Sequence, residues 1–573
     1  MSQPRSIREL DFRPKAGKVA WNAGREWREE FIYFLLVDRF HDGKERTPMT
    51  GPGRSRGFGT QDQLKRFCGG NLRGITRHLD YIAGLGCTSL WLSPVFENVE
   101  APDPASSSYH GYAIRNYLNV DPRFGTKDDL IALVDAAHAR GMRVFLDAVA
   151  NHCGDVFFYD QDPRSFADDG RRYEIGGWRS EEFPLPVELR NPDFFHRRGQ
   201  IRPWGWDAFP ETQWGDFFSL KGFYNEEDAT GLAMQQVLID AHRYWIREAD
   251  IDGFRMDAVK HMGEMAVARF CQGLREYAYS LGKRDFFLFG ELVAGDSTIN
   301  RYAGPSTSAR HGDRTVYYGL SSVLDFPLSG VLPGVIKGFQ PPGALYARYD
   351  ALQERALTRG EEGHYLVTFV DNHDQIGQNW KRRFGTGAYD EQVIAAIGTL
   401  ICALGTPCLY YGTEQGFSGE GEGDELIREA MFDPDDPSRD ALNEGCRIYR
   451  EISRIAAVQC AEPALRFGRI YFRETSADGR SFSLPSGQPF TLAFARILAD
   501  EEVLVAYNTS TTERRSEAVI VDADANPAGS RFTFLYGQDG DLAVEGSPDP
   551  ENGARFVRLD LAPMEFVVLK RVR

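Results

Sequence analysis

Residues 130–152 read LIALVDAAHARGMRVFLDAVANH, and this stretch contains both kinds of element from which the fold is built. Apolar residues at 130, 133, 134 and 137 repeat at helical spacing, and Gly141 follows as a helix stop. Residues 144–149 then form an apolar run of the length of a strand. A helix that leads into a buried strand is typical of parallel strands joined by helical crossovers.

The same alternation continues outward in both directions. Helical spacing recurs at Ile75, Leu79 and Ile82, with Gly84 and Gly86 closing that helix. Eight strands alternating with helices favour an α/β fold of the (β/α)8 TIM-barrel type over an open doubly wound sheet. The candidate strands are Phe31–Val37, Thr88–Leu92, Val144–Val149, Gly253–Met256, Phe286–Phe289, Val323–Phe326, Leu366–Val370 and Cys408–Tyr411.

Two regions depart from the barrel pattern. From Cys153 to about Tyr224 helical periodicity is lost, which indicates an irregular domain B inserted after strand 3. After Cys460, short apolar runs separated by turn residues indicate an all-β domain, which we expect to cover a flank of the barrel rather than to bind a ligand of its own. The predicted domains are a first barrel part (1–152), domain B (153–224), a second barrel part (225–459) and a C-terminal β-sandwich (460–573).

Charge, hydropathy and cysteine usage restrict the partners. A net charge of −17 disfavours nucleic acid and anionic membranes, whereas a neutral sugar is compatible with it. No run approaches the ~18 apolar residues of a membrane helix, and the first residues lack the apolar stretch of a secretory signal. Eight scattered cysteines indicate buried free thiols rather than a disulfide framework. We therefore expect a cytoplasmic protein, of an oligomeric state that the sequence leaves open.

Four of the candidate strands carry an acidic residue at or near their C-terminal ends, where the reacting groups of a barrel lie. A carboxylate at the end of an apolar strand is costly unless it is paired or used. Arg255 precedes one of these residues, Asp257, by two positions, so both side chains share one side of the strand. In isolation such a pair is usually a structural ion pair, and we expect Asp147 to orient Arg255. The four acidic residues are Asp147, Asp257, Glu291 and Asp374.

Together these segments resemble the signature regions of the α-amylase family of glycoside hydrolases, in the order of that family. Tyr109-His110-Gly111-Tyr112 is similar to a further signature, and residues 67–75 (FCGGNLRGI) and 90–96 (LWLSPVF) are similar to other family stretches. The resemblance covers roughly residues 30 to 420. It implies a retaining (β/α)8-barrel enzyme that acts on an oligo- or polysaccharide of α-linked glucose.

The resemblance assigns the chemistry to three carboxyl groups. Asp257 matches the nucleophile, Glu291 the general acid, and Asp374 the carboxylate that holds the 2- and 3-hydroxyls of the sugar. Retention needs two carboxyl groups about 5–5.5 Å apart, one ionised and one protonated. We expect Arg255 to keep Asp257 ionised, and we expect burial and neighbouring carboxylates to keep the proton on Glu291.

The resemblance also implies a set of substrate-binding residues: His110, Tyr112, His152, Arg255, Lys260, His261 and His373. Tyr112 matches the aromatic platform beneath the sugar at the cleaved position, and Lys260 and His261 would contact the next sugar on the leaving side. The other histidines would hydrogen-bond the sugar at the cleaved position, although a single histidine is more often a core residue. We interpret the domain B tryptophans as core: Trp178, Trp204, Trp206 and Trp214.

No cofactor is required for this chemistry, but the resemblance raises the question of structural calcium. Family members often bind calcium between the barrel and domain B through an Asn matching Asn151. Here Lys221 stands in the stretch where an acidic ligand is expected, and it would repel a cation. A second family site matches Asp42, Asn71 and the Gly69 carbonyl, which are oxygen ligands suited to calcium. A loop held by Asx hydrogen bonds explains the same residues.

The motifs also bear on the reaction. Residues 257–261 (DAVKH) and 409–415 (LYYGTEQ) resemble α-amylases and cyclodextrin glucanotransferases. The first interpretation is hydrolysis of α-1,4-glucans or maltooligosaccharides through a covalent glycosyl-Asp257 intermediate. A transglycosylase or an exo-acting α-glucosidase would use the same carboxylates. A non-catalytic carbohydrate-binding member is a third alternative, against which all three carboxylates are present.

Overall fold

The centre of the molecule is a ring of eight parallel strands. The computed structural model describes residues 3–100, 107–161, 165–304, 308–311, 314–317, 319–353, 356–357, 360–375, 381–547 and 553–572. Each barrel strand pairs with the next along the chain, β19 returns to β1, and a parallel bridge between Leu324 and Val367 joins the two ends of the sheet. The TIM-barrel prediction is therefore confirmed. The strands are β1 (Ile32–Leu35), β3 (Ser89–Leu92), β6 (Arg143–Ala148), β11 (Gly253–Met256), β12 (Phe287–Gly290), β15 (Ser322–Val323), β18 (Val367–Thr368) and β19 (Thr406–Tyr410).

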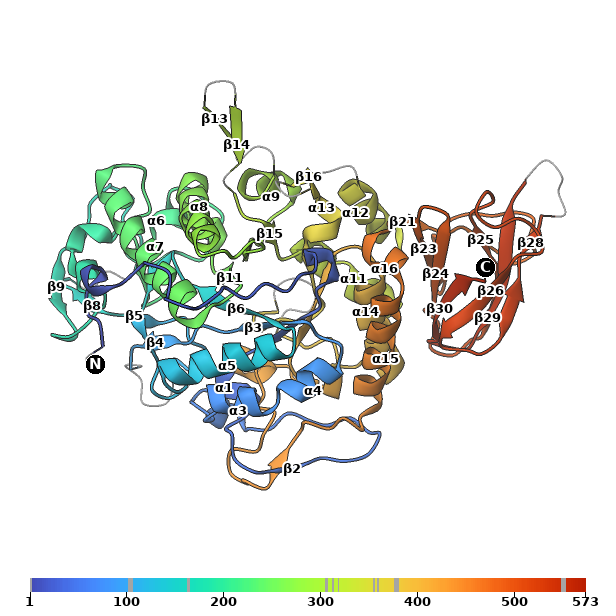
Figure 1. Cartoon of the computed structure of the whole chain (residues 1–573), viewed down its shortest axis with the longest axis horizontal. Coiled ribbons are helices and arrows are strands. Elements are labelled where there is room, and N and C mark those ends of the chain that lie inside the picture. Colours follow the sequence, from blue (N-terminus) through green and yellow to red (C-terminus); the bar gives the residue numbers. More distant parts are fainter. Residues whose placement is uncertain are drawn as a thin grey trace.

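Helices cover the outside of this ring (Figure 1). The helix predicted before the third strand is α5 (Lys127–Ala139), which begins in a capping box at Thr126 and buries its apolar side chains. The helix predicted around Ile82 is two short helices, because His78 has a non-helical backbone and separates them. The helices are α3 (Leu72–Arg77), α4 (Leu79–Gly84), α7 (Ala229–Ala249), α8 (Glu264–Ser280), α9 (Asp296–Tyr302), α12 (Gly343–Gln353), α14 (Asp390–Cys402), α15 (Arg447–Ala461) and α16 (Pro463–Phe467).

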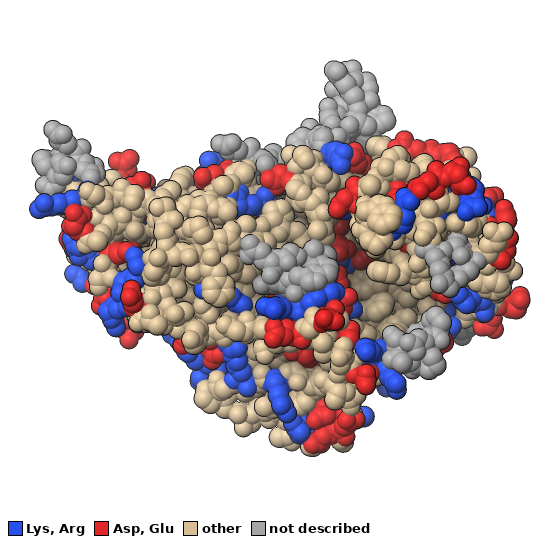
Figure 2. Space-filling view, turned by 180° about the vertical axis from the view of Figure 1, so that it is seen from behind, with Lys and Arg blue, Asp and Glu red and all other residues tan. Residues whose placement is uncertain are grey.

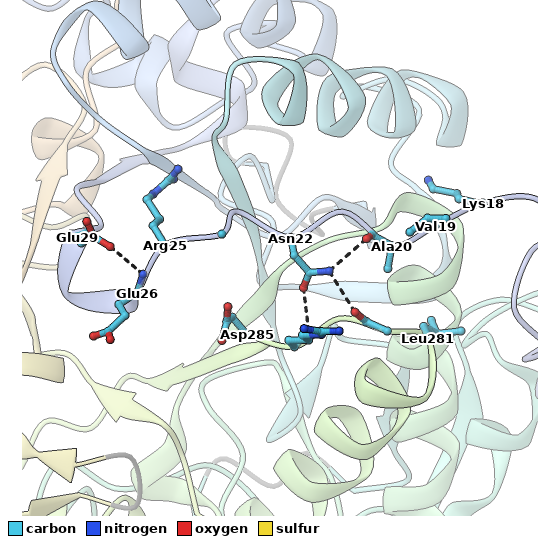
Figure 3. Close-up of a pocket in the computed structure, with 12 residues that line it drawn as sticks. Lys18, Val19, Ala20, Asn22, Arg25, Glu26, Glu29, Leu281 and Asp285 are labelled. Atoms are coloured by element: carbon cyan, nitrogen blue, oxygen red, sulfur yellow. Dashed lines mark hydrogen bonds between the residues drawn. The ribbon is translucent and has the colours of Figure 1, made fainter.

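The N-terminal segment crosses the barrel at the end where the strands begin. Trp27 stacks on Phe287 with ring centroids 3.4 Å apart and closes this end. Beside it, residues 18–29 and 281–285 border a cavity of about 910 Å³ (Figure 3). Asn22 joins its two sides by donating to the Ala20 and Gly282 carbonyls. This cavity lies at the opposite end of the strands from the predicted site, so it belongs to the scaffold.

Domain B is built from short elements and phenylalanine packing. β7 (His152–Cys153) pairs with β10 (Lys221–Gly222), so the two ends of the insertion lie side by side, while β8 (Phe157–Tyr159) pairs with β9 (Ile175–Trp178). The turn of helix α6 is Glu211–Trp214. Phe195 packs between Phe157 and Phe223 at centroid distances of 5.0 and 5.3 Å.

The interpretation of the domain B tryptophans as core is wrong for Trp204. Its side chain is 70% exposed, and the other three are only partly buried. Trp214 shows one reason, because its indole N–H donates to Glu226 at 2.7 Å and so holds the ring near solvent. The core of the small domain is therefore mainly phenylalanine, Trp178 packs against it, and Trp204 lies at the surface.

The C-terminal domain consists of two antiparallel sheets packed around a separate apolar cluster that includes Leu504 and Val557. It covers the barrel flank near α12, α14 and α15 (Figure 1), where buried Arg496 donates to the Cys402 carbonyl at the end of α14. One sheet contains β21 (Arg469–Phe472), β23 (Thr491–Leu498), β24 (Glu501–Asn508), β30 (Phe566–Arg571), β26 (Arg531–Tyr536) and β27 (Asp541–Ala543). The other contains β22 (Thr475–Ser476), β25 (Arg515–Val521), β29 (Arg555–Leu561) and β28 (Glu545–Gly546).

Two further sequence predictions concern the whole chain. All eight cysteines are free thiols, as predicted, and six of them are buried, whereas Cys68 is half-buried and Cys460 is exposed. Within the described ranges, no helix combines the length and the apolar character that a membrane crossing requires.

Candidate active site

The C-terminal ends of β6, β11 and β12 bring three acidic side chains around one buried arginine. Arg255 lies between these strands in register with Asp147 and Phe289. Its Nη1 is 2.8 Å from Asp147 Oδ1 and 2.8 Å from Asp257 Oδ1, and its Nη2 is 3.0 Å from Glu291 Oε2. Asp257 and Glu291 thus contact neighbouring nitrogens of one guanidinium group, so their carboxyl groups are close neighbours.

Asp147 is held rigidly against this arginine. Its Oδ2 accepts a hydrogen bond from the Tyr112 hydroxyl at 2.9 Å and from the Trp91 indole at 3.3 Å. The carboxylate is fully buried. Since every short contact of Asp147 holds Arg255 or a ring beside it, the contacts fit the orienting role expected for this residue.

The backbone is strained directly after two of the carboxylates. Ala258 follows Asp257 at φ +51°, and its N–H donates to Glu291 Oε2 at 2.9 Å. Gln375 follows Asp374 at φ +46°. Non-glycine residues adopt this left-handed region rarely, at a cost on the order of 1–3 kcal/mol, and such residues cluster at functional sites.

Asp374 lies on the loop after β18, and Arg428 holds it. Arg428 Nη2 is 2.8 Å from Asp374 Oδ1, and the Arg428 Nε donates to the His373 carbonyl at 2.9 Å. Arg428 was not predictable from the sequence, because nothing local distinguishes it from other loop arginines and its partner is 54 positions away. Only the tertiary fold brings the two together.

Burial and unequal charge set the protonation of this cluster. Burial raises the pKa values of Asp257 and Glu291 to about 7 against the opposing effect of Arg255, and Asp374 adds repulsion. Burial acts on Asp374 in the same direction, but His373 and Arg428 outweigh it and lower the pKa of Asp374 to about 2. The cluster therefore holds a proton near neutral pH, on the Asp257–Glu291 pair rather than on Asp374.

The predicted sugar-binding rings stand in one row. Tyr112 is stacked with His373 at a centroid distance of 5.4 Å and with His110 at 5.8 Å. Within the described part of the chain, buried His373 Nδ1 and His152 Nε2 have no hydrogen-bond partner, which is uncommon for buried polar atoms. Burial lowers the pKa of all three histidines to about 3, so the rings are neutral and suited to hydrogen bonds with hydroxyl groups.

Lys260 and His261 lie where the barrel meets domain B. They belong to the 3-10 turn Val259–His261, directly after the catalytic strand β11. His261 Nδ1 is 2.7 Å from the Thr212 carbonyl, and Lys260 forms an ion pair with Asp207, both in domain B. Figure 2 shows a hollow in the face that it draws, with acidic side chains in its wall, which disfavours an anionic ligand.

The residues proposed for the second calcium site do not fit a metal ion. Asp42 already binds two cations, with Arg46 Nη2 at 2.8 Å and Lys44 Nζ at 3.1 Å. Asn71 points its amide N–H groups at the carbonyls of Asp42 and Gly69, and its Oδ1 accepts from the Gly74 N–H. These are the Asx hydrogen bonds of a closed loop.

The junction near Asn151 does not fit a metal ion either. Lys221 pairs across the β7–β10 ribbon with Cys153, two residues after Asn151, and is only 6% exposed. Its ammonium group lies 3.0 Å from Asp155 Oδ1 and donates to the Ser219 carbonyl. A cation placed beside Asp155 would meet this ammonium. Among the described residues, no group of three or more His, Cys, Asp or Glu side chains forms a metal cage.

Comparisons with known proteins agree with this geometry. A family model described as alpha amylase, catalytic domain, matches residues 34–443. The chain is 30% identical to an alpha-amylase of Streptomyces lividans over 92% of its own length and 60% of that protein, and 27% identical to a cyclomaltodextrin glucanotransferase of Klebsiella oxytoca over 88% and 79%. The structure of an alpha-amylase from Geobacillus thermoleovorans complexed with acarbose superposes with a TM-score of 0.68 and 26% identity, over 96% of this chain and 99% of that one. This chain therefore belongs to the α-amylase family.

Proposed function

We propose that this protein cleaves α-1,4-linked glucans or maltooligosaccharides with retention of configuration. The observation that carries the proposal is the contact of Asp257 and Glu291 with adjacent nitrogens of Arg255, at 2.8 and 3.0 Å. It supports two carboxyl groups close enough for one to attack the anomeric carbon while the other protonates the leaving oxygen.

In the first step, a carboxylate oxygen of Asp257 forms a bond to the anomeric carbon as the bond to the leaving sugar oxygen breaks. Glu291 donates its proton to that oxygen, so a glycosyl ester of Asp257 and a free sugar hydroxyl result. In the second step, Glu291 takes a proton from water, and the water oxygen displaces Asp257. Asp374, held ionised by Arg428, would accept hydrogen bonds from sugar hydroxyls in both steps.

The elevated pKa of Glu291 suits its role as the acid, whereas the expectation that Arg255 keeps Asp257 ionised is not met, because burial raises the pKa of Asp257 to about 7 as well. An acid with a pKa near 7 keeps its proton at neutral pH and still releases it readily to the leaving group. Asp257 and Glu291 share one proton. When Glu291 carries it, the Asp257 carboxylate is ionised and can attack. Asp147 and Arg255 keep the pair oriented without taking part in bond changes.

Transglycosylation is the second candidate, because 27% identity relates the chain to a cyclomaltodextrin glucanotransferase. In that reaction a sugar hydroxyl, rather than water, displaces Asp257 from the same intermediate. Chromatography of the products from maltoheptaose separates the two: hydrolysis yields only shorter linear chains, whereas transfer yields longer or cyclic ones.

The catalytic assignment is tested with Asp257→Asn and Glu291→Gln. Each substitution keeps the shape of the side chain but removes the nucleophile or the acid, so kcat on maltoheptaose should fall by about 10³-fold or more. Asp240→Asn on α7, outside the site, is the matched control and should keep full activity. Unchanged thermal melting would show that the fold is intact, and near-normal turnover of either site variant would refute the proposal.

We also propose a reducing, cytoplasmic location for this enzyme. The support is that all eight cysteines are free and six of them are buried. Fractionation of the source cells tests this, and recovery of the enzyme outside the cytoplasm would contradict it.

A further inference from the structure

The two places where the resemblance implies calcium each contain a buried side-chain cation. Lys221 is only 6% exposed and lies on β10, where domain B joins the barrel. The side chain of Arg46 is 1% exposed and lies on the loop that carries Asp42 after β1. Burying a cation costs free energy unless oxygen atoms surround it, so the contacts of each one indicate its structural task.

The ammonium group of Lys221 binds oxygen atoms at the base of domain B. It lies 3.0 Å from Asp155 Oδ1 and donates to the Ser219 carbonyl at 2.8 Å. The ring centres of Phe157 and Tyr159 are 5.4 and 5.2 Å away, close enough for cation–π attraction. Because Lys221 belongs to β10 and Asp155 follows β7, this ion pair links the two ends of the insertion.

The neighbouring carboxylate oxygens have partners as well. Asp155 Oδ2 is 2.6 Å from Arg179 Nη2. Buried Asp216 accepts a hydrogen bond from the Tyr159 hydroxyl at 2.6 Å and another from the Gly222 N–H at 2.9 Å. Calcium takes about six to eight oxygen ligands, so a metal ion at this junction would compete with all of these donors.

At the second place, Arg46 contacts one carboxylate and three backbone carbonyls. Its Nε and Nη2 donate to the two carboxylate oxygens of Asp42 at 3.1 and 2.8 Å. Its Nη1 donates to three carbonyls of a distant loop, at 2.9, 2.9 and 3.0 Å, and these belong to Asp433, Asp436 and Arg439. Carboxylate and carbonyl oxygens are the ligands that calcium prefers, yet here one guanidinium group contacts the whole set.

The contacts of Arg46 also bear on the catalytic centre. Residues 433–439 belong to the long segment between β19 and α15, and this segment carries Arg428. Arg428 in turn holds Asp374 at 2.8 Å. The buried guanidinium of Arg46 therefore ties the loop after β1 to the segment that positions a catalytic carboxylate, which is a task that a bound ion could perform.

From these contacts we infer that Lys221 and Arg46 replace calcium at the two places, so that folding does not depend on a divalent metal ion. Each cation contacts oxygen atoms of two segments that are distant in the sequence, as a bound metal ion would. A metal ion at either place would have to displace a buried cation and leave that cation without its carboxylate, which is unfavourable.

Thermal melting of the wild type gives the first test, and it needs no measurement of activity. The melting temperature in excess EDTA and in millimolar CaCl2 should agree within about 1 °C. Each sample contains NaCl to the same ionic strength, so that screening of surface charge does not differ between them. A loss of several degrees in EDTA would overturn the inference.

Two variants test each place separately. Lys221→Asp removes the ammonium and adds an acidic group beside Asp155, whereas Arg46→Ala leaves the Asp42 carboxylate without its guanidinium partner. In EDTA both should melt several degrees below the wild type. CaCl2 should raise each melting temperature by about 3 °C or more, because a metal ion that binds only the folded state stabilises it. A variant that does not respond to CaCl2 would overturn the inference at its place.

Lys570 on β30 provides the matched control, because it forms an ion pair with Glu462 at 2.6 Å, outside both places. Lys570→Asp also brings two acidic groups together, so it should melt lower than the wild type, but CaCl2 should not raise its melting temperature. A gain as large as that of Lys221→Asp would mean that calcium stabilises any new acidic pair, which would contradict a specific role for Lys221. If neither Lys221→Asp nor Arg46→Ala folds, the comparison of the wild type in EDTA and CaCl2 decides.

Discussion

The catalytic centre and the base of domain B are both organised around a buried cation, but their charge balance differs. Arg255 contacts three carboxyl groups, those of Asp147, Asp257 and Glu291. At the base of domain B, Lys221 contacts Asp155, which Arg179 also binds at 2.6 Å. In the first cluster three carboxyl groups contact one cation. In the second, the carboxyl group of Asp155 contacts two cations, Lys221 and Arg179.

This difference shows that a buried cation surrounded by carboxyl groups can serve either catalysis or the stability of the fold. A carboxylate that contacts two cationic side chains ties the segments that carry them together. Three carboxyl groups around one guanidinium cannot all ionise easily in a buried site, so the pKa values of Asp257 and Glu291 rise to about 7. Burial, to which the excess of acid at the catalytic centre adds, therefore keeps a transferable proton there.

The largest expected effect comes from removing each central cation. Arg255→Met leaves three buried carboxyl groups uncompensated, and it should abolish activity as well as lower stability by ~3–5 kcal/mol. Lys221→Met should lower stability too, but its activity per folded molecule should stay within about fivefold of the wild type, because no reacting group contacts Lys221. Urea unfolding and kcat on maltoheptaose measure both. An equal loss of activity in the two variants would contradict the assignment of a catalytic role to the Arg255 cluster and a structural role to the Lys221 cluster.

The next effect is a pH dependence that only the acid-rich cluster should show. As pH rises through about 7, Glu291 loses its proton, so kcat/KM on maltooligosaccharides should fall about tenfold per pH unit. Fluoride leaves without protonation, so Glu291→Gln should hydrolyse α-maltosyl fluoride without this alkaline limb. Retention of the limb in Glu291→Gln would assign it to another group.

The smallest expected effect concerns Arg428. It forms an ion pair with Asp374, as Lys221 does with Asp155. Arg428→Gln removes the guanidinium 2.8 Å from Asp374, so the pKa of Asp374 should rise toward its ordinary value while the group stays ionised at pH 7. Activity at pH 7 should then fall by about tenfold or less, through looser positioning of Asp374. Rate profiles at pH 4 to 7 should show a new acidic limb, and its absence would mean that Arg428 does not control the ionisation.

The barrel and the catalytic strands were predictable because their signals are local. Residues 130–152 contain a helix period, a glycine stop and an apolar strand, and the structure has α5 and β6 there. The two-residue spacing of Arg255 and Asp257 correctly predicted that both side chains lie on one side of a strand and pair. Periodicity and spacing predict where helices and strands lie. Those elements determine which side chains, such as Arg255 and Asp257, lie close together.

Other features depend on tertiary contacts and left no such signal. Arg428 meets Asp374 only through the loop that follows the last strand. Trp204 of domain B was misjudged because composition does not distinguish a buried ring from an exposed one, and phenylalanines such as Phe195 fill the core. The charge of Lys221 was readable from sequence, but its partner Asp155 was not.

The closure of the barrel has a consequence for how the enzyme loses activity on heating. In the described ranges, β15 and β18 are joined by the bridge between Leu324 and Val367, by a hydrogen bond from the Asp325 N–H to the Val367 carbonyl, and by one from the Ser322 hydroxyl to the Tyr365 carbonyl. This short seam is the place where the ring should open first, and Asp374 lies on the loop that continues from β18. Mild warming should therefore displace Asp374 while Asp257 and Glu291, in the longer β11–β12 pairing, keep their places, so inactivation should precede global melting.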